Sequence, residues 1–193
     1  FAEQAGETLA IIDGVLAREN MEMAVTFQAV FLGREEDVPI CRQLFREHFG
    51  DRVPATNYVI QPPCCGADIA IEAWAMGGPG AKLDFYNENL VGVRYDGLRW
   101  VYCAGITPHE GITSAYGQAE DVFRKMSAQL SSVEASFDQV VRKWIYFGGI
   151  TADEAGTERY RELNRARTDF FADRIFGGRL LPADYQGACY PAS

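Results

Sequence analysis

Residues 115–148, AYGQAEDVFRKMSAQLSSVEASFDQVVRKWIYFG, decide the fold of this 193-residue chain. Residues 140–147 of this stretch are rich in β-branched and aromatic side chains, which favour a buried strand. Before them, apolar side chains recur every three or four positions, as on one face of an α-helix: Val122, Phe123, Met126 and Leu130. The sequence therefore predicts a helix over 115–131, a short polar turn and a strand over 140–147.

The beginning of the chain repeats this pattern of helix, turn, strand and closing glycine, with its helix over 2–19. The first two groups of matching positions share one offset and the third differs from it by one residue: Gln4-Ala5 with Gln118-Ala119; Leu9, Ile12 and Leu16 with Phe123, Met126 and Leu130; Leu32-Gly33 with Phe147-Gly148. The repeats of a solenoid are only about 20–50 residues long. The agreement therefore indicates a duplicated domain.

The composition is that of a soluble globular protein, with 48% hydrophobic and 23% charged residues. A net charge of −9 disfavours nucleic acid and anionic membranes as partners, because phosphate binding needs clustered Lys and Arg. No apolar run approaches the ~20 residues of a spanning helix. The five cysteines are odd in number and scattered, which favours reduced thiols and a cytoplasmic location. We expect no cofactor and no metal site.

The remaining elements complete the two copies. The first copy continues after its strand with a helix over 38–49 and strands over 57–60 and 68–76, and the Gly- and Pro-rich residues 77–80 follow as a boundary. The second begins with a hairpin over 90–94 and 98–105, turning at Tyr95-Asp96-Gly97, and ends with a helix over 157–171. We therefore expect an α+β fold of two units, 1–79 and 80–193.

Each unit is a mixed sheet with two helices on one face, in the order β-β-α-β-α-β-β. The first lacks its opening hairpin and the second lacks its closing strands. We expect a longer parent protein, with a hairpin before Phe1 and a pair of strands after Ser193.

This order of elements resembles the Rid family (reactive intermediate deaminases, also called YjgF-like), whose unit has a chorismate-mutase-like fold. Four segments resemble the family's motifs: residues 98–108 (LRWVYCAGITP), Gly117-Gln118-Ala119, residues 135–141 (ASFDQVV), and Asn164 ahead of Phe170-Phe171. Rid units usually form three-fold rings with clefts between neighbours. The resemblance thus implies a small carboxylated metabolite as partner and a trimer or a pseudo-symmetric tandem.

Two departures from the family concern its chemistry. Rid deaminases hold the substrate carboxylate with an Arg in a Pro-Ala-Arg-Ser motif, where this chain has Thr56 in the first copy and Ser193 in the second. The Glu that positions water in the family corresponds to Ala70, and only Glu72 of that acidic pair is kept. The first copy is therefore not expected to work as an imine deaminase.

A duplicated Rid-like protein with one degenerate copy is similar to the chorismatases, which hydrolyse chorismate to pyruvate and a cyclohexadiene or benzoate in secondary metabolism. Arg159-Tyr160, Leu163-Asn164 and the terminal Tyr-Pro-Ala-Ser look closer to that group than to simple deaminases. Three hypotheses stay open: an enzyme acting on a chorismate-like enol ether or an imine, a protein that binds metabolites without turnover, and a pseudoenzyme that serves assembly.

The resemblance implies five substrate-binding residues, and no catalytic residue is assigned: Asn164, Arg167, Arg94, Tyr95 and Gly105. Each has a plainer alternative: a solvated helix face for the first two, a hairpin tip for Arg94 and Tyr95, and a conformational role for Gly105. Cys64-Cys65 is interpreted as a pair of structural thiols, because adjacent cysteines rarely ligate one ion and neither histidine has ligand spacing to them.

Overall fold

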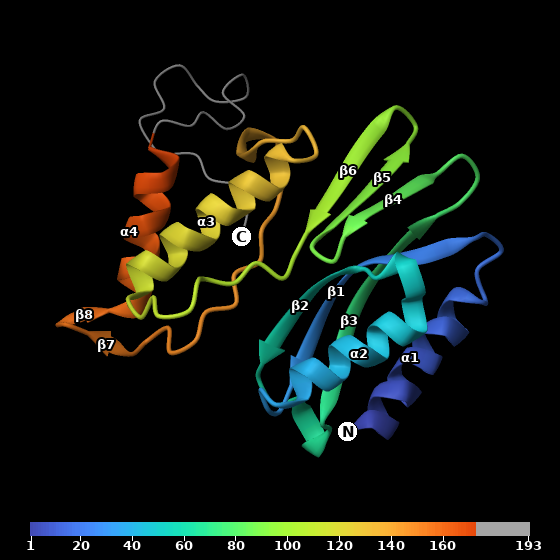
Figure 1. The fold of residues 1–193 in the computed structure, drawn as a ribbon, viewed down its shortest axis with the longest axis horizontal. Coiled ribbons are helices and arrows are strands. Elements are labelled where there is room, and N and C mark those ends of the chain that lie inside the picture. The colour runs from blue at the N-terminus through green and yellow to red at the C-terminus, as the bar shows by residue number, and fades with distance from the viewer. Residues whose placement is uncertain (173–193) are drawn as a thin grey trace. The chain divides into compact units, whose positions relative to one another are not determined.

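The structure is a computed structural model in which residues 1–172 are described (Figure 1). The chain forms two compact units, Phe1–Gly105 and Ile106–Ser193, each described here by itself. This division follows packing, whereas the predicted boundary at 77–80 follows the internal repeat. The predicted units 1–79 and 80–193 therefore stay a prediction. The Tyr-Pro-Ala-Ser sequence and Ser193 lie outside the described residues.

The first unit is built around β1 (Met23–Leu32), the central strand of a mixed sheet with the order β2-β1-β3. It pairs in parallel with β2 (Ala55–Ile60) and antiparallel with β3 (Ile69–Gly77), with a bulge between Val25 and Phe27. Both edges of β1 are thus hydrogen-bonded, and most of its side chains are buried. The strands predicted over 57–60 and 68–76 are confirmed with small shifts of their ends.

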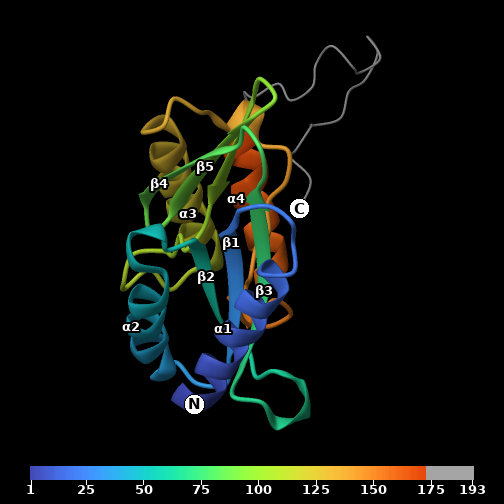
Figure 2. The same cartoon turned by 90° about the vertical axis from the view of Figure 1, so that its right-hand side faces the viewer.

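Helices α1 (Ala2–Leu16) and α2 (Asp37–Phe49) cover one face of this sheet (Figure 2). Helix α1 is three residues shorter than the predicted 2–19, and α2 agrees with the prediction over 38–49. Arg34 binds the buried Asp37 carboxylate at the start of α2 through two hydrogen bonds of 3.0 Å. The core under the helices is apolar: Ala5, Leu9, Val30, Leu32, Cys41, Phe45 and Ile69.

A second antiparallel sheet in this unit has the order β4-β5-β6, formed by β4 (Lys82–Asn87), β5 (Leu90–Tyr95) and β6 (Leu98–Cys103). The predicted hairpin at Asp96-Gly97 is confirmed, and both turn residues have positive φ, of 50° and 75°. Strand β4 was not predicted from the sequence. Its Tyr86 ring lies directly over Gly92, where a Cβ would come within 2.8 Å of the ring.

The described part of the second unit consists mainly of α3 (Ala115–Ser131) and α4 (Arg159–Phe171), which pack against each other. The Ser114 hydroxyl caps α3 by accepting a hydrogen bond of 3.2 Å from the Gly117 N–H. Aromatic rings fill the space between the helices: Phe123, Phe137, Phe170 and Phe171. Both helices were predicted, although 157–158 belong to a short strand, β8 (Thr157–Glu158), paired with β7 (Asp153–Glu154).

The strand predicted over 140–147 is wrong. These residues follow a short 3₁₀ turn (Phe137–Gln139) and run as irregular chain with a single bridge residue at Arg142. Val141 is 74% exposed. A strand needs a neighbouring strand to pair its backbone groups, and a β-rich composition does not supply one. The described part of the second unit therefore contains two packed helices and a two-stranded sheet, and no three-stranded sheet.

The packing of α1 can be tested with two residues of the same helix, one buried and one exposed. Leu9 is 4% exposed and Ile11 is 67% exposed. Leu9→Ala should lower the free energy of unfolding by about 2–5 kcal/mol, because it leaves a cavity in the core. Ile11→Ala should change it by less than about 0.5 kcal/mol. Urea unfolding followed by circular dichroism measures both, and equal effects would contradict the assigned helix face.

Candidate functional site

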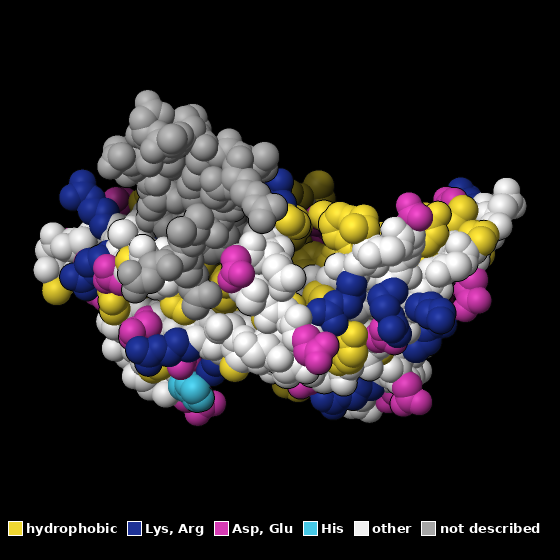
Figure 3. All heavy atoms as spheres, turned by 90° about the horizontal axis from the view of Figure 1, so that it is seen from above, with side chains coloured by type: hydrophobic (Ala, Val, Ile, Leu, Met, Phe, Trp, Pro, Cys, Tyr) yellow, Lys and Arg dark blue, Asp and Glu magenta, His cyan; other side chains and the backbone are white. Residues whose placement is uncertain are grey.

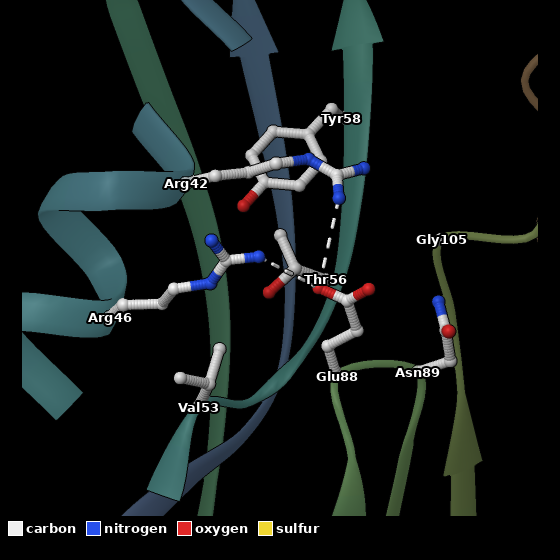
Figure 4. A pocket seen from close by; sticks show the side chains of 8 residues that line it. All are labelled: Arg42, Arg46, Val53, Thr56, Tyr58, Glu88, Asn89 and Gly105. Carbon is white, nitrogen blue, oxygen red and sulfur yellow. Dashed lines mark ion pairs between the residues drawn. The ribbon is translucent and has the colours of Figure 1, made fainter. Parts of the chain in front are cut away.

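A pocket in the first unit lies between α2, β2, the β4–β5 turn and the end of β6 (Figure 4). It encloses about 390 Å³, including space open to solvent. Eight residues line it: Arg42, Arg46, Val53, Thr56, Tyr58, Glu88, Asn89 and Gly105. It combines basic, acidic, amide and aromatic groups, and it includes Thr56, which the resemblance to the Rid family is expected to align with that family's carboxylate-binding Arg.

The position of Thr56 is fixed from behind by β1. Thr56 pairs with Gln28 across the parallel strands. The Gln28 amide nitrogen donates a hydrogen bond of 3.0 Å to the Thr56 hydroxyl, which donates one of 2.7 Å to the Pro54 carbonyl. Both side chains are buried, and the Gln28 Oε1 has no hydrogen-bond partner among the described residues. Thr56 is therefore a rigid, fully bonded part of the pocket wall.

Arg42 and Arg46 provide the positive charge of the pocket. They are four residues apart on α2 and so share one face of the helix. The Arg42 guanidinium lies 5.0 Å from the centre of the Tyr58 ring, a cation–π distance. Burial raises the pKa of Tyr58, so its phenol stays protonated and can donate a hydrogen bond at neutral pH.

Glu88 binds both arginines through a single oxygen. Its Oε2 lies 3.7 Å from Arg42 Nη1 and 3.5 Å from Arg46 Nη2, and Figure 4 shows these ion pairs as dashed lines. The three side chains are between 42% and 65% exposed, so the pairs are screened by water. An anion therefore already lies against the arginine pair.

Gly105 closes the pocket from the end of β6. Its φ is +69°, and a Cβ there would lie 2.7 Å from the Thr56 carbonyl oxygen and 2.8 Å from the Asn89 amide nitrogen. Its N–H, proposed from the sequence as a donor to a substrate oxygen, donates a hydrogen bond of 2.7 Å to Asn57 Oδ1. The glycine thus allows a close approach of two chain segments, and its own donor is engaged.

The other two predicted residues of this unit do not line the pocket. Arg94 forms an ion pair with Asp84 on the neighbouring strand, with 2.9 Å between Arg94 Nη2 and Asp84 Oδ2. Tyr95 lies at the end of β5 beside the Asp96-Gly97 turn and is 52% exposed. Both belong to the hairpin, as predicted.

Asn164 and Arg167 belong to α4 in the second unit. The Asn164 amide nitrogen donates a hydrogen bond of 3.0 Å to the Tyr160 carbonyl, and its Oδ1 is buried without a partner among residues 1–172. Arg167 lies near Lys143, which is only 3% exposed and lies 4.9 Å from the centre of the Phe171 ring. Burial and, secondarily, the Arg167 charge lower the pKa of Lys143 to about 8.

Arg159, in the segment that resembles the chorismatases, has a structural role. Its guanidinium binds the Glu154 carboxylate and donates a hydrogen bond of 3.0 Å to Gln118 Oε1. Glu154 in turn accepts hydrogen bonds of 3.0 and 3.1 Å from the Ala115 N–H at the start of α3. Arg159 thus connects the start of α4 to the start of α3.

Arg42, Arg46 and Glu88 were not predicted from the sequence. The available signal was the four-residue spacing of the arginines on a predicted helix that leads directly into Pro54-Ala55-Thr56. Glu88 gave no signal, because the strand before it was missed.

Three further observations describe the surroundings. Among residues 1–172 no helix is both long and apolar enough to span a bilayer. In the same residues, no group of three His, Cys, Asp or Glu side chains is arranged to hold a metal ion. Side chains of both charges lie next to each other on the face drawn in Figure 3.

The role of Gly105 can be tested by adding one methyl group. Gly105→Ala should lower the free energy of unfolding by at least about 1–3 kcal/mol, the usual cost of a strained backbone conformation. Gly33→Ala is the control, because Gly33 lacks positive φ and has no atom within 4 Å of a Cβ position. Thermal unfolding of the two variants gives the comparison, and equal stability would contradict the close approach.

Asp121 allows a test of the second unit by pH. Its carboxylate accepts hydrogen bonds of 2.8 Å from the His109 N–H and ring Nδ1, and lies 3.1 Å from Lys125 Nζ. Burial raises the pKa of Asp121, but these contacts outweigh it and lower the pKa from 3.8 to about 2.

A carboxylate whose pKa is lowered by folding stabilises the protein above its unfolded pKa, and this stabilisation is lost as the pH falls through the folded pKa. Asp121→Asn should therefore be less stable than the wild type at pH 6, and the difference should shrink between about pH 4 and pH 2. Urea midpoints at a series of pH values measure it. A difference that is independent of pH would contradict the assignment.

Comparisons with known proteins identify the family. Residues 72–186 match the family model described as Chorismatase FkbO/Hyg5-like, N-terminal, which is more than half of the chain. Neither a curated protein nor a solved structure matched significantly. The matched residues include β4, β5, β6, α3 and α4. The chain belongs to the FkbO/Hyg5-like chorismatase N-terminal family.

Proposed function

We propose that this protein is a small-molecule enzyme of the chorismatase type, which hydrolyses the enol ether of a carboxylated, chorismate-like metabolite. The observation that carries the proposal is the match of residues 72–186 to the chorismatase N-terminal family. The proposal includes two Rid-like units in tandem, a trimeric or pseudo-symmetric assembly, a cytoplasmic location and a role in secondary metabolism.

The pocket of the first unit supports a carboxylated ligand. A guanidinium binds a carboxylate with two parallel hydrogen bonds, and Arg42 and Arg46 offer two such groups on one side of the pocket. In the Rid family the corresponding group is an Arg at the position of Thr56. We propose that the arginines of α2 replace it, because they line the same pocket as Thr56.

The remaining residues predicted from the sequence support the proposal to different degrees. Gly105 lines the pocket and shapes it. Asn164 and Arg167 present an amide and a guanidinium on α4, beside Lys143. Arg94 and Tyr95 are proposed as parts of the hairpin border. We assign none of these residues a catalytic step.

The chemistry sets what a complete site must contain. Hydrolysis of an enolpyruvyl ether adds a proton to the terminal methylene carbon and water to the carbon that carries the ether oxygen. The resulting hemiketal then breaks its C–O bond, giving pyruvate and the ring hydroxyl. A proton donor is needed beside the carboxylate subsite. The protonated Tyr58 phenol is a hydrogen-bond donor in the pocket, which suits binding more than it suits this proton transfer.

One observation favours a second candidate, a protein that binds the metabolite or serves assembly without turnover. Thr56 and Ala70 stand where the Rid deaminases have the carboxylate-binding Arg and the water-positioning Glu. A unit without these two groups can keep a pocket and lose its chemistry.

The decisive experiment is incubation of the full-length natural protein with chorismate, with pyruvate measured by lactate dehydrogenase and NADH. We expect pyruvate in proportion to the chorismate consumed. Chorismate that binds but is not consumed would favour the second candidate, and an absence of binding would contradict both.

The arginine pair is tested with Arg42→Ala/Arg46→Ala. Loss of charge-assisted hydrogen bonds worth about 1.5–3 kcal/mol should lower kcat/KM about 10- to 100-fold. Arg18→Ala, which removes an exposed arginine outside the pocket, is the control and should leave kcat/KM unchanged. Wild-type activity in the double variant would exclude this pocket as the carboxylate subsite.

A further inference from the structure

The Glu88 side chain is held only by charge in the described structure. Its Oε2 lies 3.5 and 3.7 Å from the nearest guanidinium nitrogens, whereas a charge-assisted hydrogen bond between such groups is about 2.7–2.9 Å long. The side chain is 55% exposed. Exposed ion pairs of this kind contribute little stability, because water screens them and long side chains lose freedom when they pair.

The backbone beneath Glu88, by contrast, is well fixed. Glu88 and Asn89 form the two-residue turn between β4 and β5. The Asn89 N–H donates a hydrogen bond of 2.8 Å to Asn87 Oδ1, and its amide nitrogen donates one of 2.8 Å to the Ala104 carbonyl. The Ala104 N–H donates one of 2.9 Å to the Asn89 carbonyl. Glu88 can therefore leave the arginines by rotating its side chain, without rearrangement of the turn.

Arg42 keeps its contact with Tyr58 when Glu88 leaves, and Arg46 stays on the same face of the helix. Arg42 lies over the Tyr58 ring, and both arginines extend from one face of a helix whose other side is buried through Cys41 and Phe45. Figure 4 shows the Glu88 carboxylate facing both guanidinium groups, with a dashed line to each. A ligand carboxylate that binds the same arginines must occupy the same space.

We propose that Glu88 is a built-in competitor for the anion site of the pocket, and that a carboxylated ligand binds by displacing it. The internal carboxylate compensates the arginine pair when the pocket is empty. It also raises selectivity, because a neutral analogue cannot replace the lost ion pairs and a carboxylate can. The inference rests on the proposed function only in assigning the ligand carboxylate to Arg42 and Arg46.

The test uses 4-fluorobenzoate, a cyclic carboxylate that cannot be hydrolysed, with its binding followed by ¹⁹F NMR line broadening. Glu88→Gln removes the competing charge and keeps the shape of the side chain. Its dissociation constant for 4-fluorobenzoate should be about 2- to 10-fold lower than that of the wild type, as expected for the loss of two weak ion pairs. The gain should shrink at high salt, because the arginines are exposed.

Two variants provide the controls. Glu22→Gln removes an exposed carboxylate that pairs with Arg52 at 3.6 Å outside the pocket, and it should not change the dissociation constant. Glu88→Gln combined with Arg42→Ala/Arg46→Ala should abolish the gain. If Glu88→Gln fails to fold, Glu88→Ala replaces it, and the urea midpoint of either variant verifies the fold.

Equal or weaker binding by Glu88→Gln would overturn the proposal, because Glu88 would then be a neutral or supporting part of the site. Absence of 4-fluorobenzoate binding in the wild type and Glu88→Gln would overturn it too. These results are independent of the chorismate assay. If the protein releases pyruvate from chorismate and Glu88→Gln binds 4-fluorobenzoate like the wild type, only the competitor role of Glu88 is refuted. An inactive protein with tighter binding in Glu88→Gln would refute only the proposed reaction.

Discussion

The first unit depends on the burial of most of β1. Both edges of this strand are paired, and Val30 and Leu32 pack under the helices while Phe27 packs on the opposite face against Ala55 and Val91. In this position an unpaired polar group is costly. Its two buried polar side chains each donate a hydrogen bond, Thr26 to the Trp74 carbonyl and Gln28 to Thr56, while Gln28 Oε1 has no partner among the described residues. The second of these bonds connects the core directly to the pocket.

This connection explains why the pocket has a rigid back and a movable front. Thr56 is held by Gln28 and the Pro54 carbonyl, and Gly105 approaches its backbone closely. Arg46 and Glu88, in contrast, are more than half exposed and contact each other only through an ion pair of 3.5 Å. Burial therefore fixes the shape of the pocket, and exposed charges determine what enters it.

The sequence predicted the elements whose signal is local. The helices at α2 and α3 follow from apolar spacing, and the turn at Asp96-Gly97 follows from its need for positive φ. The strand over 140–147 was wrong because composition does not supply a pairing partner. Strand β4 was missed because it follows a Gly- and Pro-rich stretch and its alternation covers only residues 82–85. The pocket could be predicted only at Gly105, since Arg42, Thr56 and Glu88 meet through the fold and lie far apart in sequence.

Positive charge on helix α2, instead of on strand β2 at the position of Thr56, has a chemical consequence. An arginine at the position of Thr56, which is 4% exposed, would be enclosed by protein, and its charge would need permanent compensation or a bound anion. Arginines on α2 remain in contact with water and lose less solvation when the pocket is empty. They also attract a ligand more weakly, because water screens them. A pocket built in this way gains affinity only when a ligand excludes water from the arginines, which favours a carboxylate attached to a ring over a small free anion.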